Sequence, residues 1–241
     1  MATFSRLLLD SYREVPDRVS ITVLLAGKED QPITYKNLVE GAARWARTFA
    51  REGIQPGEVA VLILQHGLDL IYAYWGAILH GAIPSIMPFL TEKLQPDRYR
   101  ADLTALVCIT RPECIVTYPE FEEEVRSALP KGSSVRKVIV SDDLADSGGL
   151  DLIEFKGLTR RENDIVLLQH SSGTTGLQKG VALSHGAVCN QLESYSQSLA
   201  VTDEDVIVRW LPLYHDMGLI AGFLMPILRR IPLVLLSPFE W

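Results

Sequence analysis

The residues best suited to chemistry form one glycine-rich run in the second half of the chain. Residues 170–180 (HSSGTTGLQKG) are rich in hydroxyls and glycine, include one lysine, and lie between the apolar stretches 164–169 and 181–183. Glycines let consecutive backbone N–H groups face one anion, hydroxyls add donors, and a lysine adds mobile positive charge. The order strand, loop, lysine, strand therefore predicts a loop that can cradle phosphate.

Two other interpretations of this loop have to be weighed. A Walker A loop requires the pattern G-x-x-x-x-G-K-[ST] at the start of a helix. Here Gly173 and Gly176 are too close together, and Lys179 comes three residues after the second glycine. Gly180 also stands where a Ser or Thr is needed. An isolated glycine-rich turn is most often a surface loop that binds nothing, but the length and residue order of this run argue against that.

The elements before this loop begin with a helix and a hairpin. An amphipathic helix opens the chain, with Phe4, Leu8 and Tyr12 on one face, and a strand over 19–25 turns at 27–31 into a return strand. Thr34 is the expected cap of a helix over 35–52. This part of the chain should therefore bury one helix face against a short sheet.

Strands and helices then alternate. The stretch 59–64 is apolar at every position, which is typical of parallel strands covered on both faces by crossover helices. The pattern predicts an α/β fold with mostly parallel sheet layers flanked by helices. Its further helices are expected over 68–80, 98–110 and 120–129, and its further strands over 82–87, 114–117 and 137–140. The polar segment 141–149 is expected to be a surface loop, and residues 1–241 are interpreted as one domain.

One stretch raises the question of a membrane span. Residues 70–90 carry no formal charge, and this length could cross a bilayer. Gly81, Pro84 and Pro88 interrupt the stretch, which favours a helix that ends at Gly81 and then a buried strand. We therefore expect no membrane span, and the N-terminus has no basic and apolar pattern of a signal peptide.

Composition limits the class of partner. The 241 residues include 23 Lys and Arg against 30 Asp and Glu, a net charge of −7, and 47% are hydrophobic. This is a globular composition with no dense basic block, which argues against nucleic acid or an anionic membrane as the main partner. Cys108, Cys114 and Cys189 fit neither a zinc pattern nor paired disulfides. We therefore expect a cytoplasmic protein.

A second block of unusual composition follows the loop at 210–219 (WLPLYHDMGL). Taken alone, a His and an Asp before an apolar helix often form only a helix cap, and the following Met, Leu and Phe residues are often plain core. Ser184 is expected to cap a helix over 185–199 whose N-terminus would point toward the loop. The other histidines, His66, His80, His170 and His185, are expected to be structural.

Together the two blocks resemble one family. The loop sequence SSGTTGLQKG (171–180) is similar to the phosphate-loop signature of the acyl-adenylate-forming superfamily, which includes acyl-CoA synthetases, fatty-acyl-AMP ligases, luciferases and peptide-synthetase adenylation domains. The block at 210–219 resembles the next family motif in its fatty-acyl-AMP ligase form, at the expected spacing of about 35 residues. The segments 33–38 (ITYKNL) and 76–84 (GAILHGAIP) resemble two weaker family blocks.

The resemblance implies that ATP activates a carboxylic acid, as an acyl-adenylate, for transfer to a thiol. Two sets of site residues follow from it. The residues expected to contact the β- and γ-phosphates of ATP are Ser171, Ser172, Gly173, Thr174, Thr175, Gly176 and Lys179. The residues expected where the adenylate meets the acyl pocket are Tyr214, His215, Asp216 and Gly218, with Met217, Leu219, Ile220 and Phe223 near an apolar tunnel.

The resemblance also implies partners and an extent. Residues 1–241 correspond to the N-terminal part of the large AMP-binding domain, without the family's C-terminal domain, so this piece is expected to be inactive alone. ATP and Mg²⁺ are the implied cofactors, with the metal ligand expected beyond residue 241. The implied substrates are a fatty or other carboxylic acid and either CoA or an acyl carrier protein as acceptor. The alternative is a non-catalytic module that kept the fold and binds a nucleotide or a partner.

The last predicted strand suggests one more partner. The apolar stretch 231–236 precedes the turn at 237–239 and is expected to be a strand at a sheet edge. Exposed edges can pair with another chain, so a homodimer through this strand is a further expectation.

Overall fold

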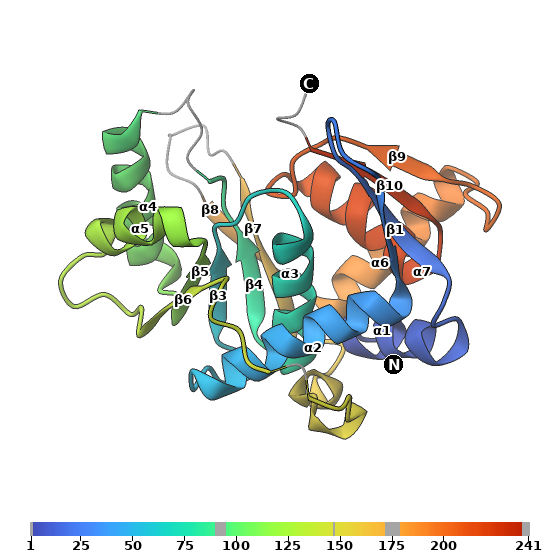
Figure 1. The fold of residues 1–241 in the computed structure, drawn as a ribbon, viewed down its shortest axis with the longest axis horizontal. Coiled ribbons are helices and arrows are strands. Elements are labelled where there is room, and N and C mark those ends of the chain that lie inside the picture. The colour runs from blue at the N-terminus through green and yellow to red at the C-terminus, as the bar shows by residue number, and fades with distance from the viewer. Residues whose placement is uncertain (1, 90–94, 147, 172–178, 238–241) are drawn as a thin grey trace.

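The computed structural model describes residues 2–89, 95–146, 148–171 and 179–237. Within them, strands form two four-stranded sheets and one two-stranded sheet, with helices around them. Sheet A has the strand order β2-β1-β10-β9, sheet B has the order β4-β3-β5-β6, and sheet C is the pair β7-β8. The two larger sheets lie in different halves of the molecule, and sheet C lies between them (Figure 1).

The N-terminal elements follow the sequence prediction. Helix α1 (Phe4–Glu14), strands β1 (Val19–Leu24) and β2 (Gln31–Thr34) and helix α2 (Tyr35–Arg51) all form. The Thr34 hydroxyl accepts the Asn37 N–H at 3.1 Å, and the Asn37 side chain accepts the Thr34 N–H at 3.2 Å. This reciprocal pair satisfies two donors at the start of α2 and so sets where the helix begins.

Sheet B is wholly parallel, as its apolar strands predicted. Consecutive residues of β3 face opposite sides of the sheet, so Ala60 and Leu62 join one hydrophobic cluster and Val61 joins another. A strand that is apolar at every position is therefore one that is buried on both faces. The strands are β3 (Val59–Leu62), β4 (Ile83–Ile86), β5 (Cys114–Thr117) and β6 (Lys137–Val140), and the helices between them are α3 (Leu68–His80), α4 (Pro96–Thr110) and α5 (Glu122–Ala128).

Helix α3 covers the first part of the uncharged stretch 70–90 and ends within it. The helix ends at His80, and Gly81 follows in the left-handed region at φ 89°, where a glycine is favoured. The chain then enters the buried strand β4. Among the described helices, none combines the length and hydrophobicity needed to cross a bilayer.

Sheet A corrects the prediction for the last strand. Strand β10 (Leu233–Leu236) is parallel to β1 on one side and to β9 (Ile207–Arg209) on the other, so it is an interior strand and not an edge. The argument for a homodimer through this strand is therefore wrong. The sequence analysis missed β9, and within the described residues β2 and β9 are the edge strands of this sheet.

The remaining elements surround sheet C. Strands β7 (Ile165–Ser171) and β8 (Lys179–Ser184) form an antiparallel hairpin, and β7 lies beside β4. Helix α6 (His185–Ser198) follows directly. The smaller elements are the 3₁₀ turns η1 (Pro119–Phe121), η2 (Leu152–Glu154) and η3 (Lys156–Thr159), the π-helix η4 (Met217–Leu224) and the short helix α7 (Met225–Arg229).

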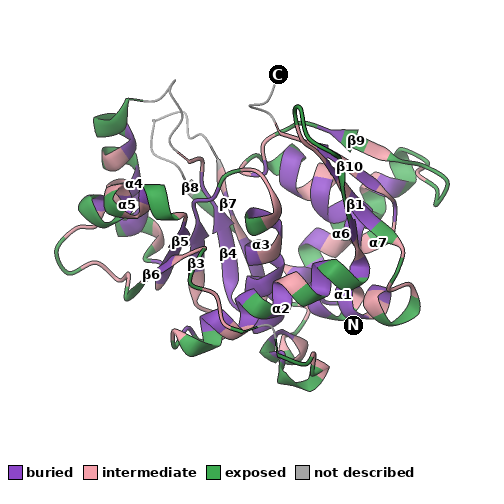
Figure 2. Ribbon diagram, viewed as in Figure 1, coloured by how far each residue is buried: buried purple, intermediate pink, exposed green. Residues whose placement is uncertain are grey.

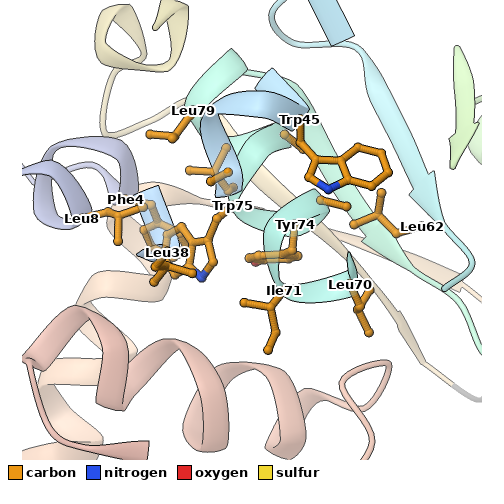
Figure 3. Packing of buried hydrophobic residues seen from close by; sticks show 14 of the residues in the cluster. Phe4, Leu8, Leu38, Trp45, Leu62, Leu70, Ile71, Tyr74, Trp75 and Leu79 are labelled. Atoms are coloured by element: carbon orange, nitrogen blue, oxygen red, sulfur yellow. The ribbon is translucent and has the colours of Figure 1, made fainter. Parts of the chain in front are cut away.

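Helices α2 and α3 form the centre of the hydrophobic core. Buried residues concentrate along both helices and on the strands beneath them (Figure 2). Trp45 lies near Leu62, whereas Phe4 and Leu38 gather around Trp75 (Figure 3). The two helices approach closely at Gly76, where a Cβ atom would lie only 2.3 Å from Cβ of Trp45. One helix pair therefore joins the packing of both large sheets.

Candidate functional site

The predicted phosphate loop connects the two strands of sheet C. Ser171 and Lys179 face each other across the antiparallel ladder and are the last described residues before and after the loop. The predicted ligands Ser172, Gly173, Thr174, Thr175 and Gly176 lie outside the described residues. The predicted strands on both sides of the loop form and pair with each other, and Lys179 is the first residue of the second strand rather than a residue before it.

A partly buried histidine near the loop end of this hairpin joins it to sheet B. Ser85 Oγ on β4 and His170 Nε2 on β7 lie 2.5 Å apart. Burial lowers the pKa of His170 to about 4, which keeps the imidazole neutral near pH 7. His170 was expected to be structural, and this contact, which joins sheets B and C, agrees with that interpretation.

Helix α6 does not point its N-terminus at the loop. The Ser184 hydroxyl accepts the Ala187 N–H at 3.2 Å, so the predicted cap forms. Ser184 is, however, at the opposite end of β8 from Lys179. Five residue steps along a strand span about 17 Å, which places the start of the helix far from the loop. The predicted direction of this helix was therefore wrong.

The second motif, residues 210–219, exposes side chains in two places, at Trp210 and Leu211 and again over residues 215–217. His215 and Asp216 are exposed and Met217 is 60% exposed, whereas Gly218 is buried. A Cβ atom at Gly218 would lie 2.1 Å from the Pro212 carbonyl oxygen, so the turn requires glycine there. The motif therefore has an anchored inner side and an open outer side.

The aspartate of this motif acts as a cap in the structure. Asp216 Oδ1 accepts the Met217 N–H at 2.7 Å at the start of the π-helix η4. The capping interpretation of Asp216 is therefore confirmed, and a role in ligand binding stays a prediction. π-Helical segments are rare and frequently occur at functional sites, so η4 is consistent with a functional role for this motif.

A cavity of about 360 Å³ lies beside the exposed side of the motif. Of the residues expected near an apolar tunnel, Met217 and Ile220 line this cavity, whereas Leu219 and Phe223 are 2% and 0% exposed and lie in the core; the tunnel itself stays a prediction. The cavity lies between α6 and η4, and its lining residues are Gln191, Leu192, Tyr195, Asp216, Met217, Ile220 and Ala221. A larger cavity of about 720 Å³, between α2, β2 and residues 148–150, includes none of the predicted site residues.

Three polar side chains that the sequence analysis did not assign to the site donate to or accept from the backbone of the motif; two of them are buried and one is partly buried. Gln169 Nε2 donates to the Tyr214 carbonyl at 2.8 Å, and His66 Nε2 accepts the Leu213 N–H at 3.0 Å. Arg209 Nη1 donates to the Gly218 carbonyl at 2.5 Å. Gln169 lies at the end of the stretch 164–169, which was predicted to be a strand, and Arg209 lies in a segment for which no element was predicted. His66 was expected to be structural.

The described residues include no group of three or more His, Cys, Asp or Glu that could hold a metal ion. The three cysteines are unpaired, in agreement with the sequence analysis.

Comparison with known proteins agrees with these two motifs. A family model described as AMP-binding enzyme matches residues 9–240. The chain therefore belongs to the AMP-binding enzyme family, as the sequence resemblance predicted.

Curated relatives include ligases that act on different acids. The chain is 28% identical over 244 residues to the long-chain-fatty-acid–AMP ligase FadD26 of Mycobacterium bovis, a match that covers 98% of this chain and 41% of that protein. It is 27% identical over 222 residues to 4-coumarate-CoA ligase 1 of Narcissus pseudonarcissus, which covers 90% of this chain and 40% of that protein. The chain thus spans about two fifths of the length of these relatives.

Solved structures show the same architecture. The fatty acid AMP ligase from Legionella pneumophila superposes with a TM-score of 0.82 at 25% identity, over 99% of this chain and 40% of that one. A fatty acyl-adenylate ligase from L. pneumophila in complex with acyl adenylate and pyrophosphate superposes with a TM-score of 0.79 at 26% identity, over the same shares. The α/β fold class is therefore confirmed.

Proposed function

We propose that this chain is the N-terminal part of the large domain of an enzyme that activates a fatty or other carboxylic acid with ATP. The observation that carries the proposal is the combination of the β7–β8 hairpin and the 210–219 motif, joined directly by the contact from Gln169 to Tyr214. Relatives that share both the family and nearly the whole of this chain are acyl-AMP and acyl-CoA ligases. They support an acid–thiol ligase as the whole enzyme.

The reaction consists mainly of positioning and charge stabilisation. A carboxylate oxygen of the acid attacks the α-phosphorus of ATP, the bond to the β-phosphate oxygen breaks, and pyrophosphate leaves with that electron pair. The carboxylate is already ionised near pH 7, so no general base is required. The chain has to align the two reactants and stabilise charge on the phosphates.

The two motifs divide this work. The hairpin residues Ser171 and Lys179, with the loop residues between them, would bind the β- and γ-phosphates through hydroxyls, backbone N–H groups and one ammonium. Tyr214, His215, Asp216 and Gly218 would lie where the adenylate meets the acyl group. The cavity beside Met217 and Ile220 would take the apolar chain of the acid.

Cofactor, acceptor and location remain parts of the proposal. ATP is proposed because the chain belongs to the AMP-binding enzyme family, and Mg²⁺ would accompany it, held by a carboxylate. The acceptor would be CoA or an acyl carrier protein, both of which occur in the names of relatives. The enzyme would act in the cytoplasm. A module that kept the fold and binds only a nucleotide or partner is the alternative.

The Lys179→Ala variant tests the phosphate site. Loss of a charged hydrogen bond costs about 1.5–3 kcal/mol, so the affinity for MgATP, measured by calorimetry, should fall roughly 10- to 100-fold. Lys131→Ala is a matched control, because Lys131 is exposed and lies outside both motifs. Equal affinities for the two variants would contradict the proposal. Acid-dependent ATP–pyrophosphate exchange in the complete enzyme separates a ligase from a binding module.

A further inference from the structure

The backbone of the 210–219 motif is held at three points, each by a polar side chain from a different sheet. Gln169 belongs to sheet C, His66 follows strand β3 of sheet B, and Arg209 belongs to sheet A. Their bonds to Tyr214 O, Leu213 N and Gly218 O are 2.8, 3.0 and 2.5 Å long. We call these three side chains the motif clamp.

Two of the three clamp side chains are buried, and the third is partly buried. Gln169 is 7% exposed and Arg209 is 4% exposed, and His66 is partly buried. Burying a polar or charged side chain is costly unless it is hydrogen-bonded. Each of these side chains uses a bond to the backbone of the motif, and each bond joins the motif to a separate part of the fold. Such an arrangement fixes a backbone in space rather than only filling the core.

The environment of His66 keeps it suited to this role. The Nε2 atom can accept the Leu213 N–H only while the imidazole is neutral. Burial, together with the charge of Arg209, lowers the pKa of His66 to about 4. The accepting form of His66 is therefore present at neutral pH.

Arg209 reaches the motif through space that a glycine leaves open. A Cβ atom at Gly222 would lie 2.8 Å from Cδ of Arg209. The guanidinium meets the Gly218 carbonyl near the start of the π-helix η4. The long side chain and the glycine thus work together to hold the first turn of this helix.

Gln169 connects the strand that leads into the predicted phosphate loop to the 210–219 motif. It lies on β7, two residues before Ser171, and its amide reaches the carbonyl of Tyr214 in the other motif. A direct hydrogen bond therefore ties the β7–β8 hairpin to the residue just before His215 and Asp216, while His66 bonds the neighbouring Leu213 and Arg209 bonds Gly218.

We propose that Gln169, His66 and Arg209 are positioning residues that set the placement of the 210–219 motif relative to the β7–β8 hairpin. The part of this inference that concerns catalysis rests on the proposed function. An in-line attack on phosphorus is sensitive to displacements near 1 Å, so loosening the clamp should slow the reaction more than it weakens binding of either substrate.

The first experiment tests the clamp without relying on any activity. Hydrogen exchange is measured on this chain, on His66→Leu and on His66→Gln, whose amide oxygen can still accept a hydrogen bond. In His66→Leu the Leu213 amide should exchange at least 10-fold faster, while amides of β3 and β5 keep their rates. His66→Gln should restore most of the protection. Equal exchange of Leu213 in all three proteins would overturn the clamp.

The second experiment tests positioning in the complete enzyme, with decanoate as the acid. Gln169→Glu keeps the shape of the side chain and removes the donor to Tyr214. We expect kcat for pyrophosphate release to fall at least 10-fold, with KM for ATP within threefold of the wild-type value. Gln197→Glu, exposed on α6, is the matched control.

The two experiments separate the possible failures. If the wild-type enzyme releases no acid-dependent pyrophosphate, the proposed function fails, and the exchange of Leu213 still decides whether the clamp exists. If the enzyme is active and Gln169→Glu has the kinetics of the control, the positioning role is wrong. Arg209→Lys, which keeps a charge and a donor, should lose less activity than Arg209→Met, and equal losses would argue against a role through Gly218.

Discussion

Sheets A and B are built from the chain in opposite ways. Sheet B uses four consecutive strands, and its crossover helices carry the chain either to the next strand position or, between β4 and β5, across β3. Sheet A pairs β1 with β10, so Ile21 lies beside Leu233 from the other end of the described chain. Sheet B depends on contacts that are local in sequence. Sheet A depends on closing a long loop, and the entropy of loop closure is lost before the strand contacts stabilise the sheet.

The helix pair α2 and α3 connects these two regions. Helix α2 packs on β1 and β2 of sheet A, and α3 packs on β3 and β4 of sheet B. The helices themselves meet at Gly76. A substitution that disrupts this contact should therefore lower the stability of both sheets. A substitution within one sheet should show how far the folding of the other sheet is independent of it.

The largest effect is expected for Gly76→Val. The new side chain would start 2.3 Å from Cβ of Trp45 and 2.8 Å from the Ala42 carbonyl oxygen, and a backbone atom cannot move aside cheaply. We expect a loss of more than about 4 kcal/mol in the free energy of unfolding, with sheets A and B lost together. Urea denaturation followed by circular dichroism measures this.

Gly149→Ala is the control for that variant, because a Cβ atom there has no neighbour within 4 Å. Its stability should stay within about 0.5 kcal/mol of the wild-type value. If Gly76→Val were as stable as this control, the two helices would not join the two sheets in the way described.

A smaller effect is expected for a matched pair, Ile21→Ala in sheet A and Ile115→Ala in sheet B. Both residues are fully buried, so each change should cost about 3 kcal/mol. The kinetics should differ. Local contacts tend to form early, so Ile115→Ala should mainly slow folding and Ile21→Ala should mainly speed unfolding. Stopped-flow chevron analysis distinguishes them, and the same partition in both variants would remove the distinction between the sheets.

The smallest effect concerns acid. His185 Nδ1 accepts the Phe4 N–H at 3.1 Å, a contact between residues 181 positions apart in the sequence. Burial, with the nearby charge of Arg160, lowers the pKa of His185 from 6.5 to about 4. As the pH falls, the unfolded chain is protonated first. Stability is therefore full above pH 6.5 and is lost as the pH falls toward 4.

The His185→Gln variant measures this contribution. Between pH 7 and pH 5.5 a histidine with this shift costs about 1 kcal/mol. The acid-induced decrease in unfolding free energy should be smaller by that amount in His185→Gln than in the wild type. His66 and His170, whose pKa values are also lowered to about 4, keep the remaining pH dependence. An unchanged pH dependence of the unfolding free energy in the variant would show that the bond between Phe4 and His185 does not respond to acid.

The sequence predicted the local elements well and the sheet connections less well. The bounds of α3, β5 and β6 agree with the predicted ranges, because apolar runs ended by glycine or polar turns are local signals. Strand β9 was missed because it has three residues, with exposed Val208 beside buried Arg209, a pattern that does not indicate a strand. The interior place of β10 depends on β1 and could not be inferred from its own residues.

The site divides in the same way. The glycine-rich loop was predicted from its residue types, whereas the 210–219 motif was recognised by its resemblance to a family block, and its exposed His215, Asp216 and Met217 are consecutive. Leu219 and Phe223 were expected near a tunnel, but the helical rotation places them in the core. The bonds from Gln169, His66 and Arg209 to the motif could not be predicted, because each joins residues that meet only in the folded chain.

The pairing of β1 with β10 also affects how the protein is made. The ribosome produces β1 and β2 near the start of synthesis, yet β10 emerges about two hundred residues later, on the order of ten seconds or more at ordinary elongation rates. Throughout that time one side of β1 has no partner strand, and Ile21 and Val23 have no β10 beside them. A nascent chain in this state is a natural client for chaperones, and slow synthesis would lengthen its exposure.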